Sequence, residues 1–146
     1  MAKKVLTRAE IADMAKTWYR KLDVHAPLIE ILPMLASTGL RMKFPEATLR
    51  GLAAFEGWYE GVIRIFFDEV HKVKSVKPVI RGDQANVKIV VRWEASRWNP
   101  PAATSDRIVL DAYQTWAVRR SKTSGRPEIV TYSVDKLKYA RGSARL

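Results

Sequence analysis

The fold class of this chain is decided by the stretch GDQANVKIVVRW, residues 82–93. Its first pair, Gly82-Asp83, is typical of a turn between two strands. After the turn, Val87, Ile89, Val91 and Trp93 recur at every second position and so share one face of a strand. The stretch therefore predicts an antiparallel pair of strands, the first of which begins near Glu69, where the apolar period changes to two.

Two further strands are predicted toward the C-terminus. Residues 108–118 and 129–137 have the composition of long strands, and Gly125-Arg126-Pro127 lies in the connection between them. Residues 140–146 are predicted to form a loose tail.

Helical patterns precede these strands. Thr7 and Glu10 match a capping box, and apolar residues spaced three or four apart run through residues 11–22. Pro27 suits the first position of a second, shorter helix. Pro33 is expected to kink that helix or to end it early, because proline lacks the amide hydrogen that the helix needs.

A short alternating strand at residues 40–44 is followed by the longest helical pattern, which predicts a helix from Leu49 to Phe66. With helices first and long antiparallel strands second, we predict an α+β fold in which the helices cover one face of a strongly curved sheet. No repeat and no long linker divides the chain. We expect a single domain over residues 1–146 with a core at about 7–139.

Composition excludes several classes of protein and site. The chain has 146 residues, of which 47% are apolar and 28% charged, as in an ordinary globular domain. Cysteine is absent, which excludes disulfides, thiolate-bound metals and a thiol nucleophile. With only two histidines we expect no metal site. No apolar run is long enough for a signal sequence or a membrane span, so we expect a cytoplasmic location and no membrane partner.

The charge balance raises a separate question. Lys and Arg number 26 against 15 Asp and Glu, giving a formal net charge of +11. Such an excess favours nucleic acid as a partner when it gathers on one face. Lys72, Lys74, Arg81 and Lys88 are candidates for the outer sheet face. No nucleic-acid-binding motif accompanies them, so we expect a solvated surface and rank nucleic-acid binding third among the functions.

The order of elements resembles the nuclear-transport-factor-2-like fold, and more narrowly its SnoaL-like group. The motifs that carry the resemblance extend over roughly residues 10–139, and their order and spacing matter more than any one of them. They are Leu22-Asp23, Phe44-Pro45, Leu49-x-Gly51, Phe55, Trp58-Tyr59, His71, Gly82-Asp83-x-Ala85-x-Val87, Thr115-Trp116, Gly125-Arg126-Pro127 and Ile129.

This resemblance implies a cone, in which a curved sheet wraps around helices and encloses an apolar pocket. Members include ketosteroid isomerases, limonene epoxide hydrolases, scytalone dehydratases and polyketide cyclases, as well as binding and assembly modules. Most are dimers and most use no cofactor, so we expect a homodimer and no cofactor. Because one fold serves many chemistries, function has to be argued from the site.

Asp23 and His71 are the first candidates for catalysis. In scytalone dehydratase-like relatives an Asp near this position pairs with a strand His inside the cone, and His71 matches that His. A carboxylate that holds an imidazole fixes its tautomer and stabilises its protonated form, so His71 would move a proton and Tyr19 would bind a carbonyl oxygen. Alternatively, Asp23 caps the second helix and His71 is a structural residue.

Three other polar residues are weaker candidates for ligand binding. His25 either reaches the cavity or caps the helix. The dehydratase-like relatives carry a second His on a neighbouring strand, where this chain has Val91-Arg92-Trp93-Glu94, so the dehydratase reaction itself is in doubt. Asp111 and Tyr113 share one strand face, which either lines the cone or points outward.

Aromatic residues are abundant, and some of them should line a pocket for an apolar ligand. For any single one, a place in the core is the simpler interpretation. The candidates for ligand contact are Trp18, Phe55, Trp58 and Trp93.

The leading hypothesis is a cone domain that binds a hydrophobic small molecule and acts as a cofactor-independent acid–base enzyme. The reaction would be dehydration, isomerisation or cyclisation of a carbonyl compound. The alternative from another class is a non-catalytic ligand carrier or dimeric assembly module.

Overall fold

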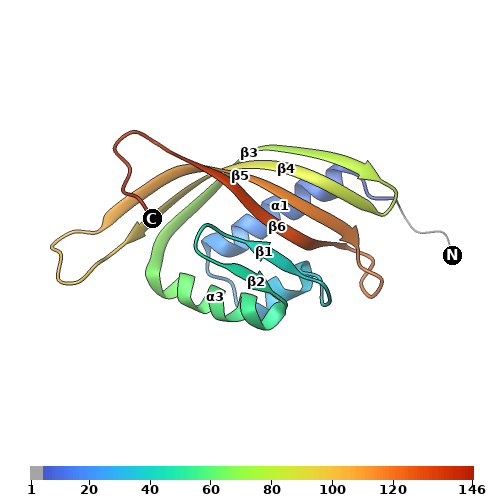
Figure 1. Cartoon of the computed structure of the whole chain (residues 1–146), viewed down its shortest axis with the longest axis horizontal. Helices are drawn as coiled ribbons and strands as arrows, with labels where there is room; N and C mark the ends of the chain where they lie inside the picture. Colours follow the sequence, from blue (N-terminus) through green and yellow to red (C-terminus); the bar gives the residue numbers. More distant parts are fainter. Residues whose placement is uncertain (1–4) are drawn as a thin grey trace.

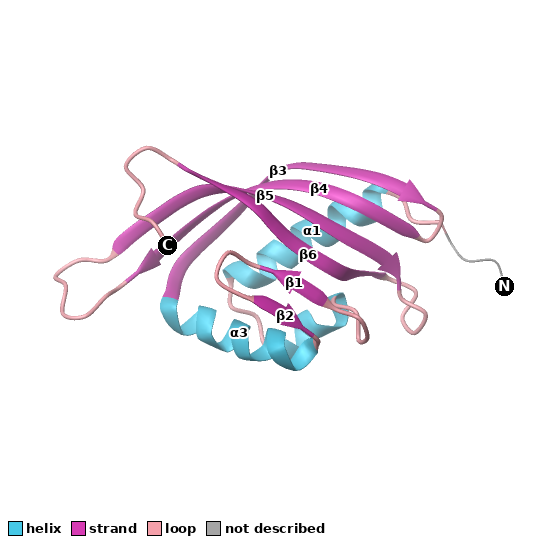
Figure 2. Ribbon diagram, in the orientation of Figure 1, coloured by secondary structure: helices cyan, strands magenta, loops and turns pink. Residues whose placement is uncertain are grey.

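The structure is a computed structural model that describes residues 5–146. Its long strands arch over helix α1, and helix α3 lies below the sheet at the end where strand β3 begins (Figures 1 and 2). In chain order the elements are α1 (Arg8–Asp23), α2 (Leu28–Ile31), the 3₁₀ helix η1 (Leu32–Met34), β1 (Arg41–Lys43), β2 (Thr48–Arg50), α3 (Leu52–Ile65), β3 (Phe66–Arg81), β4 (Gln84–Arg97), β5 (Asp106–Arg120) and β6 (Pro127–Tyr139).

The strands form one sheet in the order β2-β1-β6-β5-β4-β3. All neighbouring pairs are antiparallel except β1 and β6, which run parallel. Helix α1 packs on β3 and β6 across the inner face of the sheet. The predicted α+β architecture with helices on one face of a curved sheet is confirmed.

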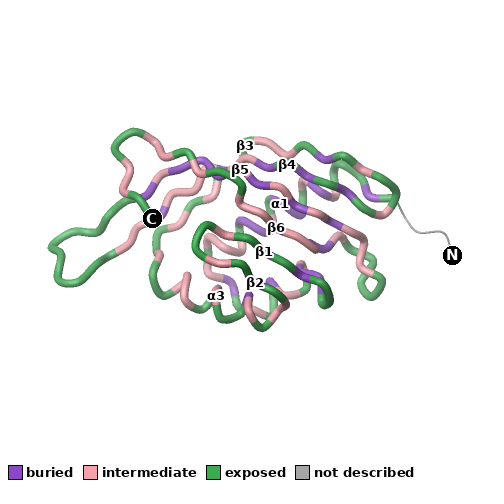
Figure 3. The backbone as a smooth tube through the Cα atoms, in the orientation of Figure 1, coloured by how far each residue is buried: buried purple, intermediate pink, exposed green. Residues whose placement is uncertain are grey.

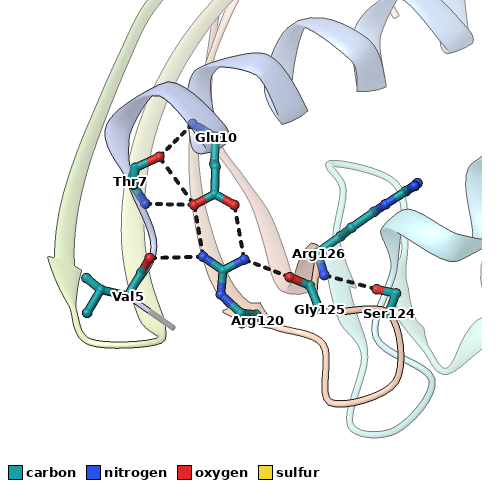
Figure 4. Close-up of polar contacts among 7 residues, drawn as sticks. All are labelled: Val5, Thr7, Glu10, Arg120, Ser124, Gly125 and Arg126. Carbon is teal, nitrogen blue, oxygen red and sulfur yellow. Dashed lines mark hydrogen bonds and ion pairs between the residues drawn. The ribbon is translucent and has the colours of Figure 1, made fainter. Parts of the chain in front are cut away.

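Helix α1 begins where the capping box predicts. The Thr7 hydroxyl accepts a hydrogen bond from the Glu10 amide at 3.1 Å, and Glu10 Oε1 accepts one from the Thr7 amide at 3.2 Å. Arg120, at the end of β5, donates to both Glu10 oxygens at 2.9 and 3.0 Å and to the carbonyl oxygens of Val5 and Gly125 (Figure 4). Arg120 thereby ties the start of the first helix to the far end of the sheet.

The core lies on the face of the sheet where the apolar residues of β4 recur at every second position. Val87, Ile89 and Val91 of β4 are buried, as predicted, and buried residues recur at every second position along this part of the strand (Figure 3). The apolar stripe of α1 packs against this face. Its buried members are Ile11, Met14, Ala15, Trp18 and Tyr19.

The predicted helix from Leu49 to Phe66 is too long at both ends. Leu49 belongs to β2 and pairs with Met42 of β1, and Phe66 is the first residue of β3. Gly51 separates β2 from α3 with a φ of +84°, a conformation that favours glycine. The sequence does not predict this short hairpin of β1 and β2, because Leu49 also fits the helical spacing of α3.

The residues at the C-terminal end return along the sheet. The Ala140 and Ala144 amides donate to the carbonyl oxygens of Val109 and Arg107 at 2.9 and 3.0 Å, and the Leu146 amide donates to the Tyr139 hydroxyl at 3.2 Å. Residues 140–146, which the sequence predicts to be loose, are therefore hydrogen-bonded to β5 and β6. In the part of the chain that the structure describes, no helix is long and apolar enough to cross a membrane.

Candidate functional site

A cavity of about 730 Å³ lies between α3 and the inner face of β3–β6, within the range of about 300–1,000 Å³ that ligand pockets occupy. Most of its lining is apolar. The lining residues that have polar side-chain atoms are Glu46, Trp58, Tyr59, Glu69, His71, Trp93, Gln114, Tyr132 and Tyr139.

Asp23 and His71 form a pair at this cavity. Asp23 Oδ1 lies 2.5 Å from His71 Nδ1, and Asp23 Oδ2 accepts the backbone amide hydrogen of His71 at 3.1 Å. The His71 side chain is 10% exposed and lines the cavity, whereas Asp23 lies behind it. An ionised carboxylate can only accept hydrogen bonds, so Nδ1 carries the proton and Nε2 of a neutral His71 has the free electron pair.

Local structure explains how the pair meets. Asp23 is the last residue of α1, and α1 packs across β3, which carries His71. The ring of Tyr19, one helical turn before Asp23, stacks on the His71 ring with centroids 4.9 Å apart. On β4, Trp93 pairs in register with His71, and their rings are also stacked, at 6.3 Å. These contacts hold the imidazole in one orientation.

A second pair joins His25 to Glu69, a residue that the sequence analysis did not single out. His25 Nε2 lies 2.5 Å from Glu69 Oε2, and Trp93 Nε1 donates to Glu69 Oε1 at 3.0 Å. The Glu69 side chain is 4% exposed and lines the cavity, but His25 does not line it. Glu69 lies two positions before His71 on the same strand, and this period of two is the signal that could have found it.

A bulge at the start of β3 aims Glu69 inward. The register of β3 and β4 shifts between Phe67 and Val70, and Asp68 has a φ of +51°. Arg107 of β5 donates to the Asp68 carbonyl oxygen at 2.8 Å. Because of the extra residue, Phe66 and Glu69 both line the cavity, although strict alternation would place them on opposite faces.

Tyr19 contacts His71, but its hydroxyl is already engaged. It donates to Gln114 Oε1 at 3.0 Å, and Tyr19 does not line the cavity. Burial raises the pKa of Tyr19 well above its ordinary value, so the phenol stays protonated. The prediction that Tyr19 binds a carbonyl oxygen is wrong in this geometry, since its one hydrogen goes to Gln114.

The predicted aromatic contacts divide between core and cavity. Trp58 and Trp93 line the cavity, and their contact with a ligand stays a prediction. Trp18 and Phe55 are fully buried against each other, with ring centroids 5.9 Å apart, and neither lines it. Their prediction as ligand contacts is wrong because the stripe of α1 packs directly on α3 and β5.

Asp111 and Tyr113 lie on the face of β5 away from the cavity. The cavity-facing residues of this strand are Leu110, Ala112 and Gln114. Asp111 is bound by Arg92 at 2.9 Å and Lys74 at 3.1 Å. The hydrogen bond from Arg92 holds the pKa of Asp111 below its usual range. The prediction that Asp111 and Tyr113 bind the ligand is wrong, since alternation on β5 turns both outward.

No metal centre is apparent in the described chain. Among residues 5–146, no three His, Asp or Glu side chains converge closely enough to hold an ion. The two carboxylate–imidazole pairs are separate, and each carboxylate already has an imidazole partner.

The chain matches no protein-family model and no curated protein by sequence. Solved structures match it well. A scytalone dehydratase-like protein from Novosphingobium aromaticivorans is 16% identical, with a TM-score of 0.71 over 94% of this chain and 87% of that one. The hexachlorocyclohexane dehydrochlorinase LinA-type3 from Novosphingobium barchaimii is 13% identical, with a TM-score of 0.73 over 95% and 93%.

A nuclear transport factor 2-like superfamily protein from Salmonella enterica is 14% identical, with a TM-score of 0.71 over 94% of this chain and 91% of that one. The chain therefore has the nuclear-transport-factor-2-like fold, as the resemblance implied. At these identities the likeness establishes the fold alone, and the chemistry has to come from the residues of this chain.

Proposed function

We propose that this domain binds an apolar small molecule in its cavity and catalyses a proton transfer through Asp23 and His71. One observation carries the proposal: Asp23 Oδ1 lies 2.5 Å from Nδ1 of an imidazole that itself lines an apolar cavity. A carboxylate–imidazole pair whose imidazole lines a cavity is an arrangement from which acid–base catalysis is built.

The chemistry follows from the tautomer. With Nδ1–H donated to Asp23, Nε2 of His71 accepts a proton from the ligand, and the carboxylate stabilises the imidazolium that forms. The protonated ring then returns the proton to another atom of the same ligand. Such a cycle produces isomerisation, cyclisation or elimination without a cofactor.

The ligand is expected to be an apolar compound with an acidic C–H bond. The largely apolar lining supports the first property, and the imidazole base of His71 in that lining supports the second. Among proteins of this fold are a scytalone dehydratase-like protein and a hexachlorocyclohexane dehydrochlorinase, whose names denote elimination reactions on small molecules. Membership in the SnoaL-like group stays a prediction.

A specific dehydratase reaction is not proposed. The stretch Val91-Arg92-Trp93-Glu94 on the neighbouring strand has no His where the resemblance implies a second one, and the Trp93 indole N–H is bound to Glu69. We therefore restrict the proposal to proton transfer at carbon next to a carbonyl group.

A non-catalytic carrier is the second candidate, and the engaged hydroxyl of Tyr19 favours it, because one expected catalytic group is missing. The homodimer and the cytoplasmic location stay predictions. Nucleic-acid binding is less favoured, since Lys72 and Lys74 on the outer face are paired with Glu94 and Asp111.

Exchange of α-hydrogens tests the proposal without knowledge of the substrate. The bicyclic ketone α-tetralone is incubated with the protein in deuterium oxide, and NMR follows the loss of its α-hydrogens. Wild type should accelerate exchange, and His71→Gln should lose about 100-fold or more of that acceleration. Equal rates for wild type and His71→Gln would leave the carrier as the better interpretation.

A further inference from the structure

Gln114 is a buried amide whose orientation is fixed by its neighbours. It is 5% exposed and lies on the cavity-facing side of β5. Its Oε1 accepts two hydrogen bonds, from the Tyr19 hydroxyl and from Trp116 Nε1, both at 3.0 Å. An indole nitrogen can only donate, so the atom that faces Trp116 must be the oxygen of the amide.

The amide nitrogen of Gln114 consequently points away from Trp116. Within residues 5–146, Gln114 Nε2 makes no hydrogen bond of good geometry, the Tyr132 hydroxyl is a polar neighbour of the amide, and the residue lines the cavity. An acceptor inside the cavity would therefore give an amide hydrogen of Gln114 a partner. The Tyr132 ring lines the same wall, and its hydroxyl has Gln114, Tyr19 and Trp18 as polar neighbours.

Gln114 and His71 belong to one wall of the cavity. Tyr19 connects them, since its ring stacks on His71 and its hydroxyl donates to Gln114. Both residues line the same cavity, so one ligand could present an oxygen to Gln114 and a carbon to His71. The apolar remainder of the lining provides space for the hydrocarbon part of such a molecule.

We propose that Gln114 Nε2, with the Tyr132 hydroxyl beside it, forms the subsite that binds an acceptor oxygen of the ligand. This inference rests on the proposed function where it concerns catalysis, but the binding role of Gln114 stands without it. The ligand class is an apolar ketone, aldehyde or similar carbonyl compound whose oxygen enters first and whose α-carbon faces His71.

The same donor stabilises the charge that develops during proton transfer. When the α-C–H bond breaks, the proton goes to His71 Nε2 and the electron pair moves to the carbonyl oxygen as an enolate. Two donors on Gln114 Oε1 polarise the amide and strengthen its N–H groups as donors. They meet the enolate oxygen in a buried site, where such a hydrogen bond acts most strongly. Gln114 thus takes the role that the sequence predicts for Tyr19.

The test uses Gln114→Glu at a pH at which the introduced carboxyl group is ionised. The carboxylate keeps acceptor oxygens for Tyr19 and Trp116 and, unlike a neutral carboxyl group, has no hydrogen to donate. The matched control is Gln84→Glu, the same change at an exposed position. Dissociation constants are measured for α-tetralone and for tetralin, its counterpart without the carbonyl group. Wild type and Gln84→Glu should prefer the ketone by about threefold to tenfold, and Gln114→Glu should lose this preference.

Infrared spectroscopy gives a second readout that needs no variant. The carbonyl stretch of α-tetralone bound to wild type should lie below its frequency in hexane, because the oxygen accepts hydrogen bonds. An unshifted stretch, or an unchanged ketone preference in folded Gln114→Glu, would overturn the subsite.

The outcomes separate this inference from the proposed function. If His71→Gln exchanges α-hydrogens as fast as wild type while the ketone preference still depends on Gln114, the catalytic proposal fails and the subsite stands. If exchange depends on His71 but the preference does not depend on Gln114, the subsite fails alone. If neither probe binds saturably, the cavity does not take this class of ligand and the subsite fails too.

Discussion

The carboxylate of Asp23 is bound twice by one residue, His71, whose ring donates to Oδ1 at 2.5 Å and whose backbone amide donates to Oδ2 at 3.1 Å. The two residues are 48 positions apart, on a helix end and on a strand. Because the backbone contact fixes the carboxylate and the carboxylate fixes the ring, Asp23 acts as a positioning group for His71.

Replacing Asp23 by Asn removes the carboxylate charge that acts on His71 while it keeps the size of the side chain. Asparagine is nearly isosteric, but it carries no charge to stabilise an imidazolium, so we expect the α-hydrogen exchange of α-tetralone to slow by about 100-fold or more. Asp106→Asn, an exposed acid on β5, is the matched control and should keep the wild-type rate. A wild-type rate in Asp23→Asn would remove Asp23 from the mechanism.

Glu69 and His25 should be coupled in stability. Glu69→Gln weakens the acceptor for His25 and Trp93 inside the protein and should lower the free energy of unfolding by about 1–3 kcal/mol. In a His25→Gln background the same change should cost clearly less, because the imidazole partner of Glu69 is already gone. Urea unfolding of the four proteins measures the coupling, and strictly additive losses would show that the contact contributes nothing.

Two glycines near the start of α3 should respond in opposite directions. Gly51 has a φ of +84°, so Gly51→Ala should cost about 1–2 kcal/mol through backbone strain alone, since nothing lies within 4 Å of an added Cβ. Gly57 lies inside the helix, where an added Cβ also meets no atom. Gly57→Ala should therefore raise the free energy of unfolding by about 0.5–1 kcal/mol. If both variants changed the free energy of unfolding in the same direction relative to wild type, the hairpin that ends at Gly51 would be contradicted.

The ion pair of Glu10 with Arg120 should give the fold a distinct acid sensitivity (Figure 4). Arg120 lowers the pKa of Glu10 from 4.5 to about 2. Because the folded pKa is depressed, the stabilisation is fully present above about pH 4.5 and is lost as the pH falls toward 2. Glu10→Gln should melt below wild type at pH 6, and the difference should narrow by pH 2.5. A constant difference in melting temperature would argue against the linkage.

Local signals in the sequence predicted most of the architecture. Thr7 and Glu10, which are only three residues apart, indicate where α1 begins. The alternation that includes Val87 and Val91 indicates the inner face of β4. The spacing of Leu49 fits both a helix and a short strand, and only the pairing of Leu49 with Met42 decides for the strand. Such tertiary pairing leaves no mark on a single stretch of sequence.

The site was only partly predictable. The resemblance gave the pairing of Asp23 with His71, but the face of β5 that carries Asp111 could not be assigned without knowing which side the helices cover. The roles of Tyr19 and Gln114 depend on a hydrogen bond between residues 95 positions apart. A pattern predicts which residues are buried, but it does not predict which of two buried polar groups faces the ligand.

The most direct test of the central claim is the tautomer of His71, measured by ¹⁵N NMR of the imidazole at alkaline pH in wild type and in Asp23→Asn. The account predicts that Nδ1 carries the hydrogen in wild type and Nε2 has the free electron pair, and that Asp23→Asn loses this preference. A wild-type spectrum with the hydrogen on Nε2 would contradict the account, because the imidazole would then have no base to offer the cavity.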